Sequence, residues 1–403
     1  MKTHPISTHA TAVQRKRVRI AAIASACLAL LATNAHALNG AALGGYGIKN
    51  AGMGGAGIAL PLDASAAANN PAGMAFVPSS FAVNLVAFQG KTDVTTSNPQ
   101  LGSVVYNDNT SVAAPEGGIN WVLNPEFTIG LTFSGAGAGA DYGKSYQWAP
   151  GGPTLKAGQK VADLIPNVSW KVTPDLALGL GIIFSGQEFE SQGVPTPAGF
   201  VGGYGKQTAA GVGARIGALW NANSAVSLGA TYKMKTSMGK LGSYSRDILA
   251  YSDGVVDIPA EYGLGLAWKA SPTVVVAADY LTIQYAGVKV NQDSNGVAWK
   301  DQSVIKLGVA WDMNPTWTLR GGMSSNSELF DDAHVTNNIL SPAIDRTSYT
   351  FGASMKLTPK SDISFSAEIN PSLTRTGTRD MMGTLVTIQG QTQVLRLGYQ
   401  MQF

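Results

Sequence analysis

Hydrophobic and polar positions alternate strictly along the end of the chain, LRLGYQMQF. Successive side chains of an extended strand point to opposite faces, so this pattern predicts a β-strand that runs to the last residue. One face would carry Leu395, Leu397, Tyr399, Met401 and Phe403, and the other Arg396, Gly398, Gln400 and Gln402. The apolar face needs an apolar neighbour, and the pattern alone leaves open whether that neighbour is a protein core or lipid.

The same alternation recurs along most of the chain. It is found at 127–133, 176–184, 212–220, 226–234, 262–268, 274–280, 305–311, 317–323 and 349–357. Tight turns are predicted at Asn124-Pro125, Thr173-Pro174, Asn221 to Ser224, Ser271-Pro272, Asn314-Pro315 and Thr358-Pro359, mostly because proline fixes φ and ends a strand. Six such turns, with both chain ends on one side, predict seven hairpins and fourteen strands, the first from near Phe81 and the last to Phe403. Pairing of these two strands would close the sheet.

Longer polar stretches lie between the tight turns. Two of them, at 135–160 and 186–206, are rich in glycine, alanine and polar residues and are expected to be loops. Short turns at one end of a sheet and long loops at the other are the arrangement of outer-membrane barrels.

Composition favours a membrane barrel over a soluble β-sandwich. Charged residues are 13% of the chain, 48 residues are glycine, and no apolar run beyond the N-terminal segment is long enough for a transmembrane helix. Tryptophans lie near the predicted strand ends, as in an interfacial girdle: Trp121, Trp170, Trp220, Trp268, Trp311 and Trp317. The charges within strands, such as Arg215, Asp279 and Lys306, lie on the face opposite the apolar residues. This suits a polar lumen, although a sandwich could expose the same face to water.

The first 37 residues have the features of a secretory signal peptide. Basic residues without an acid precede an apolar run, Ile20 to Ala32, and Ala35-His36-Ala37 offers a cleavage site after Ala37. A buried core helix and a lipoprotein leader with Cys27 are the alternatives. Cleavage would remove the one cysteine and five basic residues, and would turn the formal charge of +3 into a slightly negative one. We therefore expect no disulfide, no metal or other cofactor and no nucleic-acid partner.

Residues 38–80 differ from the rest of the chain. They contain many small residues, little alternation and almost no charge. A flexible linker is one reading, but the segment is rich in alanine and would be poorly solvated. A compact plug inside the barrel, residues 81–403, fits better, since a lumen of fourteen strands leaks unless something fills it. Glycines 54, 55 and 57 would allow tight turns against the wall.

The same segment carries a family resemblance. The run GGAGIA from Gly54 to Ala59, then Asp63-Ala64-Ser65 and Asn70-Pro71-Ala72, resembles the N-terminal plug of the long-chain fatty acid transporter family of Gram-negative outer membranes, which includes aromatic-hydrocarbon channels. The resemblance implies an all-β transmembrane antiparallel barrel with a plug in its lumen. It also implies passive uptake of a hydrophobic ligand, movement of the plug and lateral exit through the wall. Gly54, Gly55, Gly57, Asn70, Pro71 and Ala72 would be the plug and gating residues.

The ligand class stays open between long-chain fatty acids, the first candidate, and aromatic or alkane hydrocarbons. A fatty acid carboxylate would need a cation in the lumen, and the candidates are Arg215, Lys306, Arg320 and Arg396. The alternative is that each of these stabilises the wall in a pair with Asp279, Glu261 or a plug group.

The resemblance also implies partners. We expect contacts with outer-membrane lipids, recognition of the C-terminal Phe403 by barrel-assembly machinery, and a monomer. Three other functions were considered. A barrel hydrolase would use His334 with nearby Ser and Asp residues, a diffusion porin would have a charged constriction and no plug, and an adhesive barrel would have dominant loops. The sequence favours a transporter without enzymatic activity.

Overall fold

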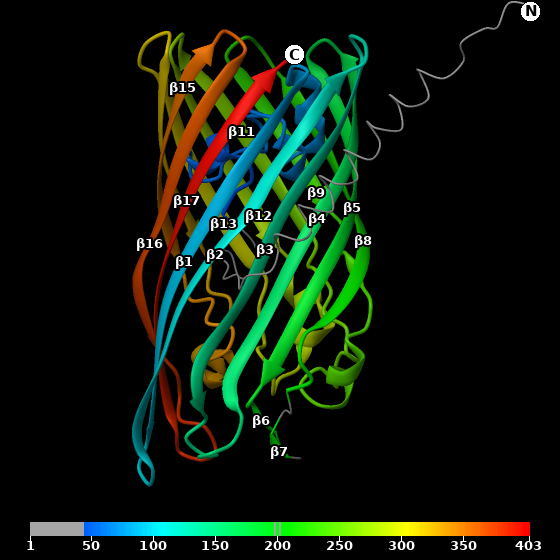
Figure 1. Ribbon diagram of the computed structural model, residues 1–403. Helices are drawn as coiled ribbons and strands as arrows, with labels where there is room; N and C mark the ends of the chain where they lie inside the picture. Colours follow the sequence, from blue (N-terminus) through cyan, green and yellow to red (C-terminus); the bar gives the residue numbers. More distant parts are fainter. Residues whose placement is uncertain (1–43, 197–198, 201–202) are drawn as a thin grey trace, which may run out of the picture. The chain divides into compact units, whose positions relative to one another are not determined.

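The computed structural model describes residues 44–403 except 197–198 and 201–202. Fourteen long strands form one antiparallel barrel (Figure 1). They are β1 (Ser80–Asn98), β2 (Gly102–Val122), β3 (Phe127–Ser145), β4 (Thr154–Thr173), β5 (Leu176–Gln192), β8 (Gln207–Asn221), β9 (Val226–Lys233), β11 (Glu261–Ser271), β12 (Val274–Ile283), β13 (Gln302–Asp312), β14 (Trp317–Asn326), β15 (Thr347–Thr358), β16 (Ser361–Thr376) and β17 (Leu385–Gln402). The predicted signal peptide, residues 1–37, lies outside the described residues.

The barrel closes between its first and last strands, as the sequence predicts. β1 pairs with β17 from Ser80 opposite Gln402 to Ser97 opposite Leu385, and β8 pairs with β9 to complete the circle. The backbone nitrogen of Phe403 donates to Ser79 O at 3.0 Å, so the pairing extends to the last residue. All six predicted tight turns join neighbouring strands, and they lie at the same end as the C-terminus (Figure 1).

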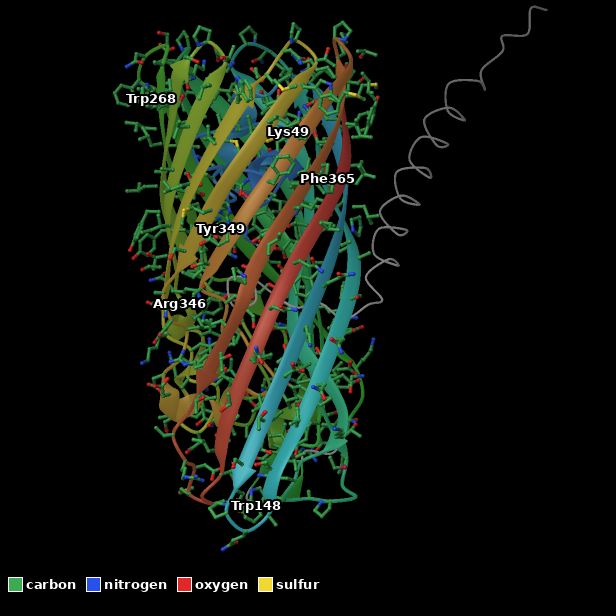
Figure 2. The ribbon with its side chains drawn as sticks, turned by 90° about the vertical axis from the view of Figure 1, so that its left-hand side faces the viewer. Lys49, Trp148, Trp268, Arg346, Tyr349 and Phe365 are labelled. Atoms are coloured by element: carbon green, nitrogen blue, oxygen red, sulfur yellow. The ribbon has the colours of Figure 1, made fainter. Side chains whose placement is uncertain are left out.

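Alternation along each strand separates an apolar outer face from a polar inner face. On β17, Leu397 is 55% exposed, whereas the neighbouring Arg396 is 1% exposed. The six girdle tryptophans are all exposed and all lie near short turns. Trp268 marks this end in Figure 2, and Trp148 lies at the opposite end. Outward apolar residues and inward charges are therefore consistent features of the whole wall.

The two expected loops are mostly strand, which corrects the sequence prediction. β3 continues to Ser145 and β4 begins at Thr154, so only eight residues of the 135–160 stretch connect them. β5 likewise continues to Gln192. In an alternation of glycine and alanine the two faces differ little in hydrophobicity, so the pattern does not predict a strand. Such residues still adopt a strand when neighbouring strands supply hydrogen-bond partners.

Shorter elements complete the described chain. The strands β6 (Pro195–Thr196) and β7 (Gly199–Phe200) form a separate pair, and β10 (Ser237–Met238) adds to the edge of β8. Single-turn helices lie between the long strands: η3 (Gly242–Arg246), η4 (Tyr285–Gly287), η5 (Lys289–Gln292), η6 (Asp332–His334) and η7 (Thr336–Asn338). Within the described residues no helix is both long and apolar enough to span a membrane.

The segment before β1 lies inside the barrel, in the half that carries the short turns (Figure 1). It contains one turn of helix, α2 (Ile48–Ala51), and two 3-10 helices, η1 (Ala66–Ala68) and η2 (Pro71–Phe76). We call residues 44–79 the plug. Nearly all of its residues are buried, and their neighbours are inward-facing residues of the wall.

Candidate functional site

The Asn-Pro-Ala triplet fixes the plug to the wall. Asn70 precedes η2 and caps it, because its Oδ1 accepts from Ala72 N at 3.1 Å. Its Nδ2 donates to Ile58 O of the plug at 2.9 Å and to Ala218 O of β8 at 3.0 Å. Pro71 occupies the first helical position, where no N–H is needed, and its carbonyl accepts from Ser169 Oγ at 2.6 Å.

The third residue of the triplet is small because the wall is close. Ala72 is fully buried and lies against Gly179 of β5, where an added Cβ would overlap the backbone of Pro71 and Ala72. Further inward glycines lie as close to the plug: Gly118, Gly229, Gly308 and Gly322 face its backbone, and Gly217 faces the Asn70 and Pro71 side chains. We call these six residues the glycine belt. The belt lets the plug backbone lie directly on the wall, without intervening side chains.

The three plug glycines have separate structural reasons. Gly54 and Gly55 have φ of 68° and 78°, in the left-handed region that favours glycine. Gly54 N donates to Thr350 Oγ1 of β15 at 2.7 Å. Gly57 has an ordinary φ, but a Cβ there would meet Asn69 Nδ2 at 2.8 Å. Their part in gating stays a prediction.

Asp279 is the acidic anchor of the plug. It lies on the inner face of β12, and its Oδ2 accepts from Gly57 N at 2.7 Å and Ile58 N at 3.1 Å. Lys306 of β13 lies directly opposite Asp279 in the ladder. Together with Arg215 they line a small polar cavity of about 20 Å³ beneath the plug residues Ala68 and Asn69.

The four cations named from the sequence all face inward and lie at the level of the plug. Arg215 donates to Asn69 O at 3.0 Å and forms an ion pair with Glu261. Arg320 donates to Ser354 Oγ at 2.6 Å, and Arg396 lies 3.4 Å from Glu368. Lys306 faces Asp279, as described above. Arg215 therefore links the wall to the plug, and contact of any of the four with ligand stays a prediction.

A larger cavity lies beyond the plug, on the side of the loops. Its volume is about 620 Å³, and apolar and aromatic side chains dominate its lining, including Phe189, Tyr251, Val256, Val288, Trp299 and Ile339. Tyr46 of the plug, Lys233 and Glu261 form the polar part of the lining nearest the plug. The Nζ of Lys233 is 3.8 Å from Glu261 Oε2, so this cation is loosely paired. Such a cavity is suited to a small apolar molecule with at most one polar end.

The wall beside this cavity is interrupted between β2 and β3. The two strands pair only from Gly117 opposite Phe133 to Val122 opposite Thr128, although each continues well beyond this ladder and pairs with its other neighbour. Figure 1 shows the two strands diverging toward the loop end. Side chains reconnect them further along, where Lys144 Nζ donates to Val105 O at 2.9 Å. Residues 109–116 and 134–140 therefore face each other without a ladder, and Ala136 in this stretch also lines the cavity.

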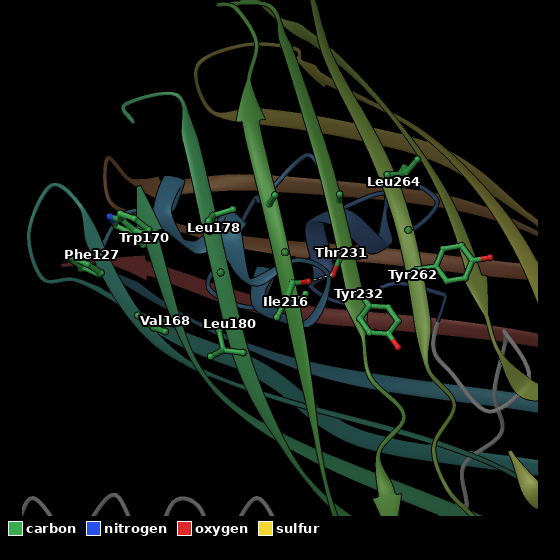
Figure 3. Close-up of a pocket in the computed structure, with 15 residues that line it drawn as sticks. Phe127, Val168, Trp170, Leu178, Leu180, Ile216, Thr231, Tyr232, Tyr262 and Leu264 are labelled. Carbon is green, nitrogen blue, oxygen red and sulfur yellow. Dashed lines mark hydrogen bonds between the residues drawn. The ribbon is translucent and has the colours of Figure 1, made fainter. Parts of the chain in front are cut away.

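A second apolar hollow lies on the outside of the barrel. It has a volume of about 740 Å³ and crosses β3 to β11 between outward side chains such as Trp170, Leu180, Tyr232 and Leu264 (Figure 3). Its lining is almost wholly apolar and faces outward, so it belongs to the lipid-facing surface of the wall rather than to the lumen.

The sequence places the chain in a known family. The model of the family described as outer membrane protein transport protein (OMPP1/FadL/TodX) matches residues 28–403. The chain belongs to this family. It is therefore an outer-membrane transport protein, a channel for hydrophobic small molecules and not an enzyme. No curated protein matches the sequence.

Solved structures share the fold. The toluene transporter TodX of Pseudomonas putida has a TM-score of 0.67 and 19% identity, with 89% of this chain and 99% of that chain covered. A Pseudomonas aeruginosa FadL homologue has a TM-score of 0.67 and 16% identity, with 92% and 100% covered. The Ralstonia pickettii toluene transporter TbuX has a TM-score of 0.66 and 19% identity, with 89% and 99% covered. These structures confirm the fourteen-strand barrel fold.

Sequence reasoning missed the residues around the cavity. Tyr46 and Lys233 line the cavity and Glu116 bonds to the plug, and an inward position in the strand was the signal available for Lys233 and Glu116. His334, considered for catalysis, contacts Asp331 at 2.5 Å and Ser294 O at 3.3 Å, and no serine hydroxyl bonds to it in the described chain. No cluster of three or more His, Cys, Asp or Glu residues in the described part of the chain could hold a metal ion.

Proposed function

We propose that this protein takes up hydrophobic molecules passively. The ligand enters from the loop end, occupies the apolar cavity, displaces part of the plug and leaves sideways through the wall into the membrane. The cavity carries this proposal, because it is a largely apolar space of about 620 Å³ next to the plug. Transfer of an apolar molecule from water into such a space is favourable by about 25 cal/mol for each Å² buried, so no energy source is needed.

Lateral exit has a candidate location. The unpaired stretch between β2 and β3 lies beside the cavity, and Ala136 belongs to both. Separation of fully paired strands would break several backbone hydrogen bonds, whereas these residues have none between them to break. A ligand that leaves here enters the membrane without crossing the aqueous periplasm.

Two ligand classes fit different parts of the cavity. Long-chain fatty acids, the first candidate from the sequence, are supported by Lys233, whose loose pairing leaves it able to hold a carboxylate. Aromatic hydrocarbons are supported by the aromatic lining, and TodX and TbuX are described as toluene transporters. The acids in the lining, including Asp163, Asp247 and Asp293, also disfavour an anion. On the strength of Lys233 we propose fatty acids, with hydrocarbons as the alternative.

Competition binding tests the proposal. The purified barrel in detergent would be loaded with radiolabelled oleate and challenged with toluene, and then in the reverse order. We expect saturable oleate binding. The variant Val288→Trp, which fills the cavity, should weaken binding by more than tenfold. Val276→Trp on the outer face of β12 is the matched control and should bind as the wild type does. Equal binding by both variants would place the ligand outside the cavity.

A further inference from the structure

One buried carboxylate connects the plug to the interrupted wall. Glu116 is the first residue of β2 beyond the last ladder pair, Gly117 opposite Phe133. It faces inward and is 1% exposed. Its Oε1 accepts a hydrogen bond from Gly47 N of the plug, and its Oε2 accepts none from the described residues. The Glu116 side chain, at the edge of the unpaired stretch, is therefore bonded to the plug by a single backbone N–H, that of Gly47.

The other end of this connection reaches the cavity. Tyr46 precedes Gly47 in the chain and lines the large cavity. Its ring packs against the buried cluster that contains Ile165 and Ile183, and its carbonyl accepts from Asn69 Nδ2 at 2.9 Å. A ligand in the cavity can thus touch the residue next to the bond that Glu116 makes.

Gly47 is placed where a small rotation would break that bond. Its φ is 80°, which only glycine adopts readily, and it forms the N-cap of α2 without a side-chain cap. Asp63 lies on its other side, where both carboxylate oxygens would be 3.0 Å from an added Cβ. Gly47 is therefore held between two buried carboxylates, Glu116 and Asp63, each with one oxygen that accepts no hydrogen bond among the described residues.

We propose that Tyr46, Gly47 and Glu116 form a latch that couples occupancy of the cavity to the interrupted wall. Ligand displaces the Tyr46 ring, Gly47 turns away from Glu116, and the bond between the plug and the edge of the unpaired stretch is lost. The rest of the plug stays in place through Asp279, Ser169 and the glycine belt. Glu116 and Tyr46 are positioning residues here, because they act on the plug and wall. The inference rests on the proposed uptake function and adds the residues that transmit the signal.

Hydrogen exchange of the plug amides tests the latch in the full barrel, with oleate and toluene as separate probes. In the wild type, ligand should speed exchange of residues 44–51 about tenfold, as expected when one buried hydrogen bond to a charged group is lost, while 71–76 stay protected. In Glu116→Ala these amides should exchange fast without ligand. Glu116→Gln keeps an acceptor oxygen and should restore the slow exchange.

Two more variants complete the design. Thr350→Val removes a plug bond on the far wall, from Gly54 N, and should leave exchange of 44–51 unchanged. In Tyr46→Ala, at probe concentrations that saturate binding, neither probe should change the exchange of 44–51. A ligand response in Tyr46→Ala equal to that of the wild type, or slow resting exchange in Glu116→Ala, would overturn the latch.

Uptake into cells at equal surface levels separates the latch from the proposed function. Uptake by the wild type, with at least tenfold slower uptake by Tyr46→Ala, supports both. Wild-type rates in Tyr46→Ala and Glu116→Ala would overturn the latch and leave the transport function standing. If the wild type takes up neither probe, the transport function itself is overturned. Hydrogen exchange of residues 44–51 without ligand, compared between Glu116→Ala and Thr350→Val, would still decide the latch.

Discussion

The two halves of the lumen are built from the same wall but are filled in opposite ways. In the half with the short turns, the inward positions include the glycine belt, and the plug backbone lies directly against the strands. In the half with the loops, inward positions and loop helices carry large side chains such as Phe189, Tyr285 and Trp299, and they enclose a cavity. Where the inward residues are glycines, the plug backbone occupies the lumen. Where the inward side chains are large, they leave a cavity for an apolar ligand.

The two halves also differ in how they are held together. The plug half depends on polar bonds from the wall to plug backbone groups, made by side chains such as Asp279, Ser169 and Thr350. The cavity half depends on a hydrophobic cluster that includes Leu281, Phe330 and Ile388. Buried polar bonds specify one position, because leaving either partner unpaired is costly, whereas apolar contacts tolerate rearrangement around a ligand. This difference suits a fixed plug below an adaptable binding space.

The largest expected effect comes from the acidic anchor. Asp279→Ala removes the acceptor for Gly57 N and Ile58 N and leaves Lys306 without the carboxylate opposite it. We expect the free energy of unfolding, measured by urea titration in lipid vesicles, to fall by about 3 kcal/mol. Asp293→Ala at the cavity is the control and should cost under about 1 kcal/mol. Equal losses of unfolding free energy in the two variants would show that the plug half depends on polar interactions no more than the cavity half does.

A smaller effect is expected from filling the glycine belt. In Gly179→Val the new side chain would overlap the plug backbone at Pro71 and Ala72, and overpacking of this kind costs about 1–3 kcal/mol. Gly186 lies on the same strand with nothing within 4 Å of an added Cβ, so Gly186→Val should be neutral or slightly stabilising. Protease sensitivity of the plug, compared between the two variants, measures the displacement. A plug that stays protected in Gly179→Val would contradict the close packing.

Lys233 tests the boundary between the halves. Lys233→Met removes the one lysine of the cavity lining but keeps an unbranched apolar side chain. If a fatty acid is the ligand, oleate affinity should fall about tenfold, in line with the loss of a charge-assisted hydrogen bond, while toluene affinity stays unchanged. Unchanged oleate affinity would favour hydrocarbons.

The smallest effect is expected in a loop beyond the membrane. Hydrogen bonds from the His334 and Lys300 side chains lower the pKa of Asp331 to about 2. A lowered folded-state pKa contributes stability above the unfolded value of about 4, and this contribution is lost as pH falls toward about 2. Because Asp331 is largely exposed, Asp331→Asn should cost under about 0.5 kcal/mol at pH 7 and nothing at pH 2. Urea titrations of both proteins at the two pH values measure this, and an equal difference at both would contradict it.

Strand positions followed closely from the sequence, and the limits of that prediction have a physical cause. Apolar alternation on one face identified most strands, because lipid selects for it residue by residue. It failed at 135–145, where glycine and alanine extend without an apolar signal. The four inward cations were identified, and Asp279 and Glu261 were named as acids that could pair with them. The individual pairs and the partner of Arg396, Glu368, were not identified, since paired residues lie far apart in sequence.

The sequence by itself determined the class of protein: its alternation, its terminal Phe403 and its Asn-Pro-Ala triplet identify a plugged barrel. These features are local, and each follows from the period of a strand or the chemistry of a helix cap. Only the tertiary structure decided where the cavity lies, which wall positions touch the plug, and that β2 and β3 separate beyond Gly117. Those features depend on ladder register and on contacts between residues tens to hundreds of positions apart, and no local pattern records them.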